Sequence, residues 1–423
     1  MAQRKKKANT NQQQKVAIAH QKNEYWRRFR FILNGLTGFD AYSLLSKTDI
    51  DKGYILRAHS LKIIAAQNNA IPVQLLHEIK IILSNWAKKE SIQLLPSGLE
   101  ISLDEFYTYG MTIFGMGTIL NDDQPNSKKI KTALNDYISS FPELLYIANN
   151  KLLLLLYVYA IEISDINRSL YWFSHTFTLS HNNKGVDNNI SIYSSKLSSM
   201  PININGNVRP ALRFGWINFE DKKPYLVSIK PLALNISSHF ANIPLDVYIQ
   251  QHAIDRLFGR IDCFSPGVIY SWVFLSLCSP RVSYDTHNNL LLEFNIFGTK
   301  AGYFRVDIVE GVILVRTFLF ITNNSTPEGE KLEQTTGIQK LDKKYLAIDK
   351  LSTFMTSEIS NSPEICQVLE NAGCRCLVEL HEQVKDICKN NSSDSTIAAM
   401  QNFLRKNKAY NQDISIPEES TTM

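Results

Sequence analysis

Residues 251–261 read QHAIDRLFGRI, and this stretch decides how the middle of the chain folds. At 100° per residue, its apolar side chains gather on one side of a helix, which predicts that this side faces a protein core. The opposite side carries His252, Arg256 and Gly259, with Arg260 on its flank. The members of the apolar side are Ile254, Leu257, Phe258 and Ile261.

The residues around this helix predict a small antiparallel sheet. A short strand at residues 247–250 precedes the helix, and a second helix is expected over residues 268–277. Three strands follow, and Glu310 and Gly311 form a two-residue turn between the last two. These strands are expected at 290–297, 303–309 and 312–322, and an earlier hairpin at 212–219 and 225–230.

Counting outward from that turn gives a predicted register for the last hairpin. Val309 faces Val312, Arg305 faces Arg316 and Tyr303 faces Phe318. One face is then a core face, and the other exposes two arginines beside two aromatic rings. Opposed arginines repel each other, so this register favours an anion lying across them, or an intervening carboxylate from Asp307 or Glu293.

The polar side of the helix at 251–261 and the arginine face of the last hairpin both have the chemistry of an RNA-binding surface. A His and an Arg one helical turn apart can hold a phosphate, and the His can move a proton near neutral pH. Arginines beside aromatic rings can pair with phosphates while the rings stack on bases. The alternative is an ordinary amphipathic helix whose polar side is only solvated.

The pattern His-Ala-x-x-Arg-x-x-x-Arg-Ile, from His252 to Ile261, precedes a short helix and a strand meander. With these elements, residues 247–322 resemble the small toxin-like domains of the RelE/colicin-type metal-independent ribonuclease superfamily. The resemblance implies RNA cleavage without metal, with His252 moving the proton and Arg256, Arg305 and Arg316 on the phosphate. The chain differs from that pattern at Gly259 and lacks a second His on the last strand.

The positive charge of the chain is concentrated at its start. Residues 1–30 contain nine Lys or Arg and one acid, Glu24, whereas the rest of the chain is slightly acidic. Such a segment indicates binding to a polyanion, here RNA, with Arg27, Arg28 and Arg30 as phosphate contacts. A solubilising terminus and, less favoured by the many Gln and Asn, attachment to a membrane surface are the alternatives.

The sequence favours a cytoplasmic protein. The residues after Lys7 have no apolar core of a secretory signal, and the longest apolar run, Leu152–Ile161, is too short to span a bilayer. That run therefore predicts a buried helix, and no integral membrane segment is expected. In a reducing compartment the thiols should be free, at Cys263, Cys278, Cys366, Cys374, Cys376 and Cys388.

The expected fold class is α+β, with a helical N-terminal domain, a small α+β middle domain with an antiparallel sheet, and a helical C-terminal extension. Residues 180–207 hold thirteen Ser or Asn, which predicts a loop or a domain junction. Residues 323–330 predict a polar loop that is either a surface connection or a binding loop. The expected parts are a disordered basic arm at 1–24, a helical domain at 25–165, a junction at 166–210, an α+β domain at 211–356, helices at 357–410 and a tail at 411–423.

No cofactor or metal is expected. Nucleotide-binding glycine loops and hydrolase or zinc-protease motifs are absent from the sequence. Cys374, His381 and Cys388 share a helix side, but successive members are about 10.5 Å apart along the axis, too far for one metal. A zinc site formed by Cys366, Cys374 and Cys376 remains as an alternative, should that stretch not be helical.

Two functions follow. The first is an RNA-associated protein whose middle domain cleaves RNA without metal. The second is a non-enzymatic interaction or scaffold protein that binds a protein partner through its N-terminal helices and nucleic acid through its basic arm.

Overall fold

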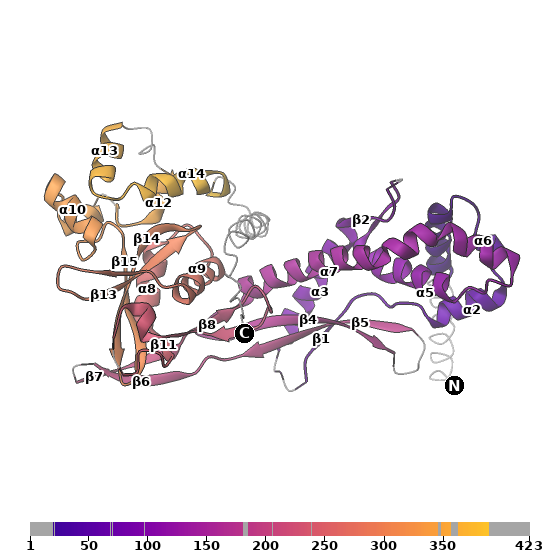
Figure 1. The fold of residues 1–423 in the computed structure, drawn as a ribbon, viewed down its shortest axis with the longest axis horizontal. Helices are drawn as coiled ribbons and strands as arrows, with labels where there is room; N and C mark the ends of the chain where they lie inside the picture. The colour runs from indigo at the N-terminus through magenta and orange to yellow at the C-terminus, as the bar shows by residue number, and fades with distance from the viewer. Residues whose placement is uncertain are drawn as a thin grey trace, which may run out of the picture. The chain divides into compact units, whose positions relative to one another are not determined.

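The computed structural model describes residues 20–388, apart from 21, 68, 70, 97, 181–184, 205, 238, 346–347 and 357–362. Most of the expected basic arm, the end of the helical extension expected at 357–410 and the expected tail at 411–423 therefore lie outside the described residues. Within them the chain has an α+β fold, as predicted (Figure 1).

The chain divides into two compact units. The first comprises residues 1–153 and 173–193, and the second comprises residues 154–172 and 194–423. Each unit therefore draws on two separate segments of the chain, and the limits at 172/173 and 193/194 fall within the junction expected at 166–210.

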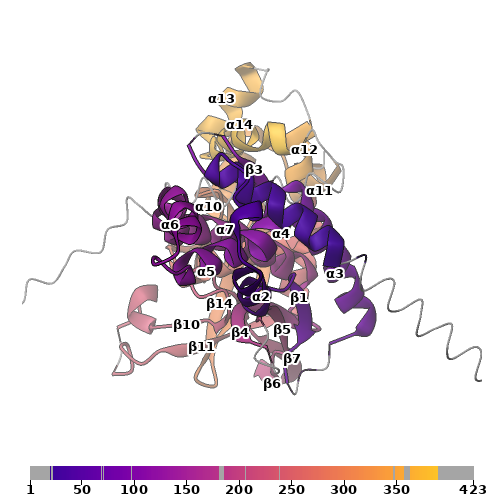
Figure 2. The same cartoon turned by 90° about the vertical axis from the view of Figure 1, so that its right-hand side faces the viewer.

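The first unit is mostly helical, in agreement with its apolar periodicity. Its opening helix covers residues 22–37. Helix α3 begins after Pro72, whose fixed φ suits a helix start. Helices α2 and α5 lie side by side (Figure 2). The remaining helical elements are η1 (Tyr42–Leu44), α2 (Lys47–Ile55), α3 (Val73–Lys89), α4 (Leu103–Glu105), the π-helix η2 (Phe106–Gly110), α5 (Met111–Ile119), α6 (Pro125–Ala133) and the start of α7 (Asn135–Ile163).

Two small sheets in the first unit were not predicted. β2 (Ser91–Gln93) pairs with β3 (Glu100–Ser102), and β1 (Lys62–Ala65) runs parallel to β5 (Val186–Ser195), which lies beside β4 (Leu170–Leu179). Of the two alternatives for residues 180–207, the loop was therefore wrong, and a boundary between the two units falls within this stretch, after Tyr193. Asn188, Ile190 and Ile192 are all fully buried, an alternation typical of a strand that the surrounding Ser and Asn residues obscure.

Helix α7 is longer than expected. The sequence predicted a buried helix over the apolar run Leu152–Ile161, whereas one helix of 29 residues extends back through Pro142. By length and composition it could cross a membrane, and the core helix of a soluble protein meets the same criterion. Half of its most apolar window is buried inside the protein. The boundary between the two units falls within it, after Leu153.

A buried polar cluster joins the π-helix to β4 and β5. The Tyr107 hydroxyl donates to Asn149 Oδ1 at 3.0 Å, and the Tyr107 ring meets the edge of His175. His175 Nε2 contacts Asn188 Oδ1, while Asn188 Nδ2 is buried without a partner among the described residues. Burial lowers the pKa of His175, although the hydrogen bond to Asn188 acts in the opposite direction. His175 is therefore held in its neutral form.

The second unit is built on an eight-stranded sheet in the order β12-β13-β14-β15-β11-β7-β6, with β10 also pairing with β11. The sheet is mixed rather than purely antiparallel, because β11 runs parallel to β15. Its strands are β6 (Ser199–Ile204), β7 (Asn207–Arg213), β10 (Ser228–Ile229), β11 (Leu245–Gln250), β12 (Val282–Tyr284), β13 (Leu290–Ile296), β14 (Thr299–Val309) and β15 (Val312–Phe320). The expected early hairpin is present as β8 (Gly215–Ile217) and β9 (Pro224–Leu226).

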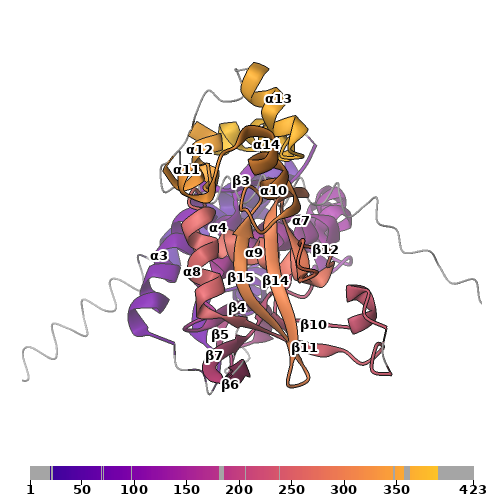
Figure 3. The same ribbon diagram turned by 90° about the vertical axis from the view of Figure 1, so that its left-hand side faces the viewer.

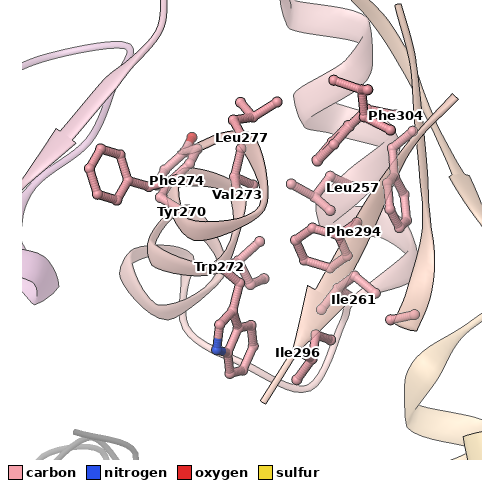
Figure 4. Close-up of a cluster of buried hydrophobic side chains, with 14 of the residues drawn as sticks. Leu257, Ile261, Tyr270, Trp272, Val273, Phe274, Leu277, Phe294, Ile296 and Phe304 are labelled. Atoms are coloured by element: carbon pink, nitrogen blue, oxygen red, sulfur yellow. The ribbon is translucent and has the colours of Figure 1, made fainter. Parts of the chain in front are cut away.

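Two helices cover one face of this sheet. The predicted helices are observed as α8 (Gln251–Arg260) and α9 (Pro266–Cys278), and α8 lies against β15 (Figure 3). Leu257 and Ile261 pack with Phe294 and Phe304 in one core (Figure 4). Gly267 permits close packing in this core, because a Cβ there would lie 2.3 Å from the Ile161 carbonyl oxygen.

The predicted turn of the last hairpin is correct, but its register is not. Val309 pairs with Val312 and Asp307 with Leu314, after which a bulge shifts the pairing between Arg305 and Val306. The bulge absorbs one extra residue of β15. Arg305 therefore faces Thr317 rather than Arg316, and Phe318 faces Phe304 rather than Tyr303.

Short helices follow β15. The polar loop expected at 323–330 ends early, because α10 begins at Pro327. Gly329 is needed there, since a Cβ would lie 1.8 Å from the Asn323 carbonyl oxygen. The buried Lys343 ammonium donates to this same turn, at the Gly329 carbonyl oxygen. The helices are α10 (Pro327–Thr336), α11 (Lys340–Tyr345), α12 (Leu351–Thr356), α13 (Pro363–Asn371) and α14 (Cys376–Cys388).

The buried His175 makes the stability of the first unit depend on pH. Its pKa is lowered in the folded protein, so the unfolded chain binds more protons just below its ordinary value of 6.5. We expect the free energy of unfolding to fall as pH drops through about 6.5. Urea unfolding at pH 7.5 and 5.5 should show a smaller loss for His175→Gln than for the wild type. His77→Gln, at an exposed position on α3, should behave like the wild type, and equal losses in all three proteins would contradict the assignment.

Candidate nucleic-acid interface

The helix over residues 22–37 separates its apolar and cationic side chains. Phe29, Ile32, Leu33 and Leu36 are buried on its inner side. Basic and polar residues lie on the outer side, together with one large aromatic side chain, Phe31, which is 56% exposed. The inner side anchors the helix in the first unit, and its outer side is left for solvent or a ligand.

A groove of about 520 Å³ runs along this outer side. The volume falls in the range of small-molecule sites, about 300–1,000 Å³. Three of its lining residues are the arginines that the sequence proposed as phosphate contacts, whereas the other three were not predicted. The groove is lined by Arg27, Arg28, Arg30, Phe31, Asn34 and Gly35.

Each arginine of the groove has a carboxylate partner. Arg27 Nη2 lies 2.9 Å from Glu24 Oε2, and Arg30 Nη2 lies 2.6 Å from Asp40 Oδ2. Arg28 Nε donates to Glu105 Oε1. The guanidinium groups are thus held in place, and the pairs differ in how far they are exposed.

The first and last pairs are open to solvent. The side chains of Arg27 and Glu24 are 76% and 51% exposed, and those of Arg30 and Asp40 are similarly open. Exposed ion pairs contribute at most about 1 kcal/mol, so a phosphate can replace the carboxylate at little cost. The hydrogen bond from Asn34, followed in size by the one from Arg30, lowers the pKa of Asp40. Asp40 therefore stays ionised and orients Arg30.

The Arg28 pair is more enclosed and anchors the helix. Burial alone would raise the pKa of Glu105. Hydrogen bonds from Arg28 and Ser102 together have the larger effect, so the pKa of Glu105 is lowered. The same bond raises the pKa of Arg28. The Arg28 guanidinium also lies over the Phe31 ring, 4.6 Å from its centroid. Arg28 therefore joins the helix to the rest of the first unit and orients the exposed ring.

Further aromatic side chains lie beside the groove. The Arg30 guanidinium is 5.8 Å from the centroid of Tyr42, whose ring neighbours Trp26. Trp26 in turn lies beside Tyr54, and Lys22 and Arg57 both contact the Tyr54 ring. Cations interleaved with aromatic rings are typical of surfaces that bind single-stranded nucleic acids.

Helix α8 presents its polar residues as predicted. His252, Arg256 and Gly259 are exposed, and Ile254 and Leu257 are buried. Among the described residues, neither His252 nor Arg256 has a hydrogen-bond or ion-pair partner. The two residues predicted to be catalytic thus remain one turn apart on an open surface.

Arg260 does not belong to the exposed pair of His252 and Arg256. Its Nη1 donates to Asp349 Oδ2, and both side chains are largely buried. Arg260 therefore joins α8 to the segment before α12, and its role in binding RNA stays a prediction.

The predicted arginine pair of the hairpin is not formed. Val306 and Val315 lie in the core with α8, and side chains alternate along a strand, so Arg305 points away from α8. Arg316 pairs with Asp307 at 2.7 Å, the alternative that the sequence left open. His252 and the hairpin arginines thus lie on opposite sides of the sheet and form no common site.

Arg305 keeps part of its donor capacity. Its Nη2 donates to Asn289 Oδ1 at 2.8 Å, whereas its Nε is buried and has no partner among the described residues. Thr317 lies opposite it. Arg305 therefore stays a prediction as a phosphate contact, separate from α8.

The two aromatic rings expected to be exposed beside these arginines are buried. Phe318 packs on Phe294 and Phe304 in the core. Tyr303 donates to Glu328 Oε1 at 2.8 Å and accepts from Lys300 at 2.9 Å. Burial raises the pKa of Tyr303. Both rings are buried, so the expectation that they are exposed was wrong.

No metal centre emerges from the described part of the chain, where no three His, Cys, Asp or Glu side chains lie close enough to hold an ion. Cys374 is buried, which raises the pKa of its thiol to about 12, and burial raises that of Cys376 to about 11. Cys366, Cys374 and Cys376 form no such group among the described residues, so the zinc alternative finds no support there.

Comparisons with protein-family models, with curated proteins and with solved structures returned no match.

The different surroundings of Arg256 and Arg260 predict different effects on stability. Arg260→Ala should lower the free energy of unfolding of the second unit by about 1–3 kcal/mol, because it leaves Asp349 buried without its partner. Arg256→Ala, on the same helix but exposed, should change it by less than about 0.5 kcal/mol. Chemical denaturation followed by circular dichroism measures both. Equal effects would contradict the structural role of Arg260.

Proposed function

We propose that this chain is an RNA-associated protein that binds nucleic acid through the outer side of the helix over residues 22–37. The observation that carries the proposal is the groove that Arg27, Arg28 and Arg30 line together with Phe31. Guanidinium groups match phosphate oxygens in geometry and charge, and they remain charged at every physiological pH.

The charge of the neighbouring sequence supports this choice. Residues 1–30 carry nine basic residues against one acid, so the groove continues a strongly cationic segment. Neutralising phosphates releases counterions, which supplies much of the affinity for nucleic acids and makes it steeply salt-dependent. The remainder of the chain is slightly acidic, so its net charge does not itself attract a polyanion.

RNA cleavage is a second proposal, favoured by the exposed pair His252 and Arg256. His252 would take the proton of a ribose 2′-hydroxyl while that oxygen attacks the adjacent phosphorus, and the 5′-oxygen would leave with a proton from solvent. Arg256 would bind the phosphate. The resemblance of residues 247–322 to RelE/colicin-type ribonucleases motivates this step, whereas the separation of Arg305 and Arg316 from α8 leaves it with fewer groups than expected.

Binding is tested with Arg27→Ala/Arg30→Ala. Loss of two phosphate contacts should weaken binding of a labelled RNA by about tenfold or more and reduce the slope of log K against log salt by about 1 to 2. Fluorescence anisotropy over a range of KCl concentrations measures both quantities. Arg209→Ala/Lys223→Ala, which removes two exposed charges from the second unit, is the matched control. Equal affinities of the two double variants would remove the groove from the site.

Cleavage is tested by incubating the full chain with labelled RNA in EDTA, beside His252→Ala. Products that disappear in the variant would establish metal-independent cleavage by this helix. Binding with no products would leave a protein that binds RNA without cutting it. A chain that neither binds nor cuts would favour the interaction or scaffold role.

A further inference from the structure

The groove holds one exposed apolar ring in a cationic surface, and this combination narrows the kind of nucleic acid that fits. We propose that it takes a single strand, with one base stacked on Phe31 and the flanking phosphates on Arg27 and Arg30. The inference rests on the proposed function and specifies the ligand of that same site.

The exposure of Phe31 is the first argument. A phenyl ring that is 56% exposed leaves apolar area in water, which a stacked base would cover. The ring is part of the groove lining. Its position is i+4 from Arg27, so the two side chains lie one turn apart on the same side of the helix.

The Arg28 guanidinium is the second argument. It lies 4.6 Å from the centroid of the Phe31 ring and is held there by Glu105. A ring whose orientation is already restricted loses less conformational entropy on binding. The cation also leaves part of the ring exposed for a base, as the accessible area of Phe31 shows.

A single strand fits this surface better than a duplex. Bases in a duplex are stacked on one another, and only unpaired bases can stack on an aromatic side chain. The helix side from Arg27 to Gly35 is about 12 Å long, a short surface in which one ring is central. Duplex RNA is instead recognised across two successive minor grooves, which needs a much longer contact.

The groove offers little to read base identity. The Asn34 side chain donates to Asp40 Oδ1 at 2.9 Å and accepts from the Tyr42 amide at 3.1 Å. Its oxygen and one of its hydrogens are therefore occupied. Stacking itself tolerates any base, so the site should bind single strands with little dependence on sequence.

The test compares a single-stranded oligonucleotide that carries one 2-aminopurine with the duplex of the same sequence. The wild-type chain should bind the single strand at least about tenfold more tightly and change its 2-aminopurine fluorescence. Phe31→Ala should weaken single-strand binding by about tenfold, the effect of losing about 1.4 kcal/mol of stacking. The salt slope should not change, because no charge is removed.

Two further variants separate stacking from other effects. Phe31→Trp should restore binding and the fluorescence change, whereas Phe31→Leu, apolar but without a ring, should not. Val73→Ala, which truncates another highly exposed apolar side chain of the first unit, should bind like the wild type. Circular dichroism confirms that each variant is folded.

The outcomes distinguish this inference from the proposed function. Equal affinity for single strand and duplex, with Phe31→Ala unaffected but Arg27→Ala/Arg30→Ala weakened, would overturn the stacking inference and leave nucleic-acid binding in place. Arginine variants that bind like the wild type would overturn both. Binding that depends on the base sequence would overturn the claim of sequence tolerance.

Discussion

The burial of one sheet face under α8 and α9 is the constraint on which the second unit depends. β11 ends at Gln250 and α8 begins at the next residue, so the chain must turn back over the sheet at once. Only the apolar side of α8 can then face β15, because burying its charged side without partners would cost several kcal/mol. His252 and Arg256 are exposed for this reason, whether or not they act on RNA.

Ion pairing explains why the second face of the same sheet is a weaker candidate for binding. Asp307 neutralises Arg316, and Glu328 accepts from both Lys300 and Tyr303 in a largely buried cluster. Partly buried pairs of this kind are costly to break, because a separated charge stays desolvated. The arginines of the helix over residues 22–37 differ, since two of their three carboxylate partners are open to water and can be exchanged for phosphate.

The elements predicted correctly are those with a strong local pattern. α8 follows from its one-sided apolar spacing, α9 from a continuous apolar stretch, and the last hairpin from Glu310 and Gly311, both of which adopt positive φ in the turn. The errors arise where a segment far away in the sequence determines the local structure. The bulge beside Arg305 has no local signature, and it moves Arg316 out of the predicted pair.

The same distinction explains the other errors. Residues 186–195 are rich in Ser and Asn, yet they form β5, because β1 from far earlier in the chain supplies a partner strand. Helix α7 continues through Pro142, although an isolated helix would be expected to kink or end there. Packing against other elements outweighs local preference at both places.

By itself the sequence determined the α+β class, the cationic start of the chain, and which side of α8 and of the opening helix is polar. These properties depend on residues close together along the chain. Only the tertiary structure decided which cations are available to a ligand. Asp349, 89 residues from Arg260, occupies that arginine, and Glu105, 77 residues from Arg28, fixes the guanidinium beside Phe31. Such pairings depend on folding, because they join segments whose separation no local periodicity encodes.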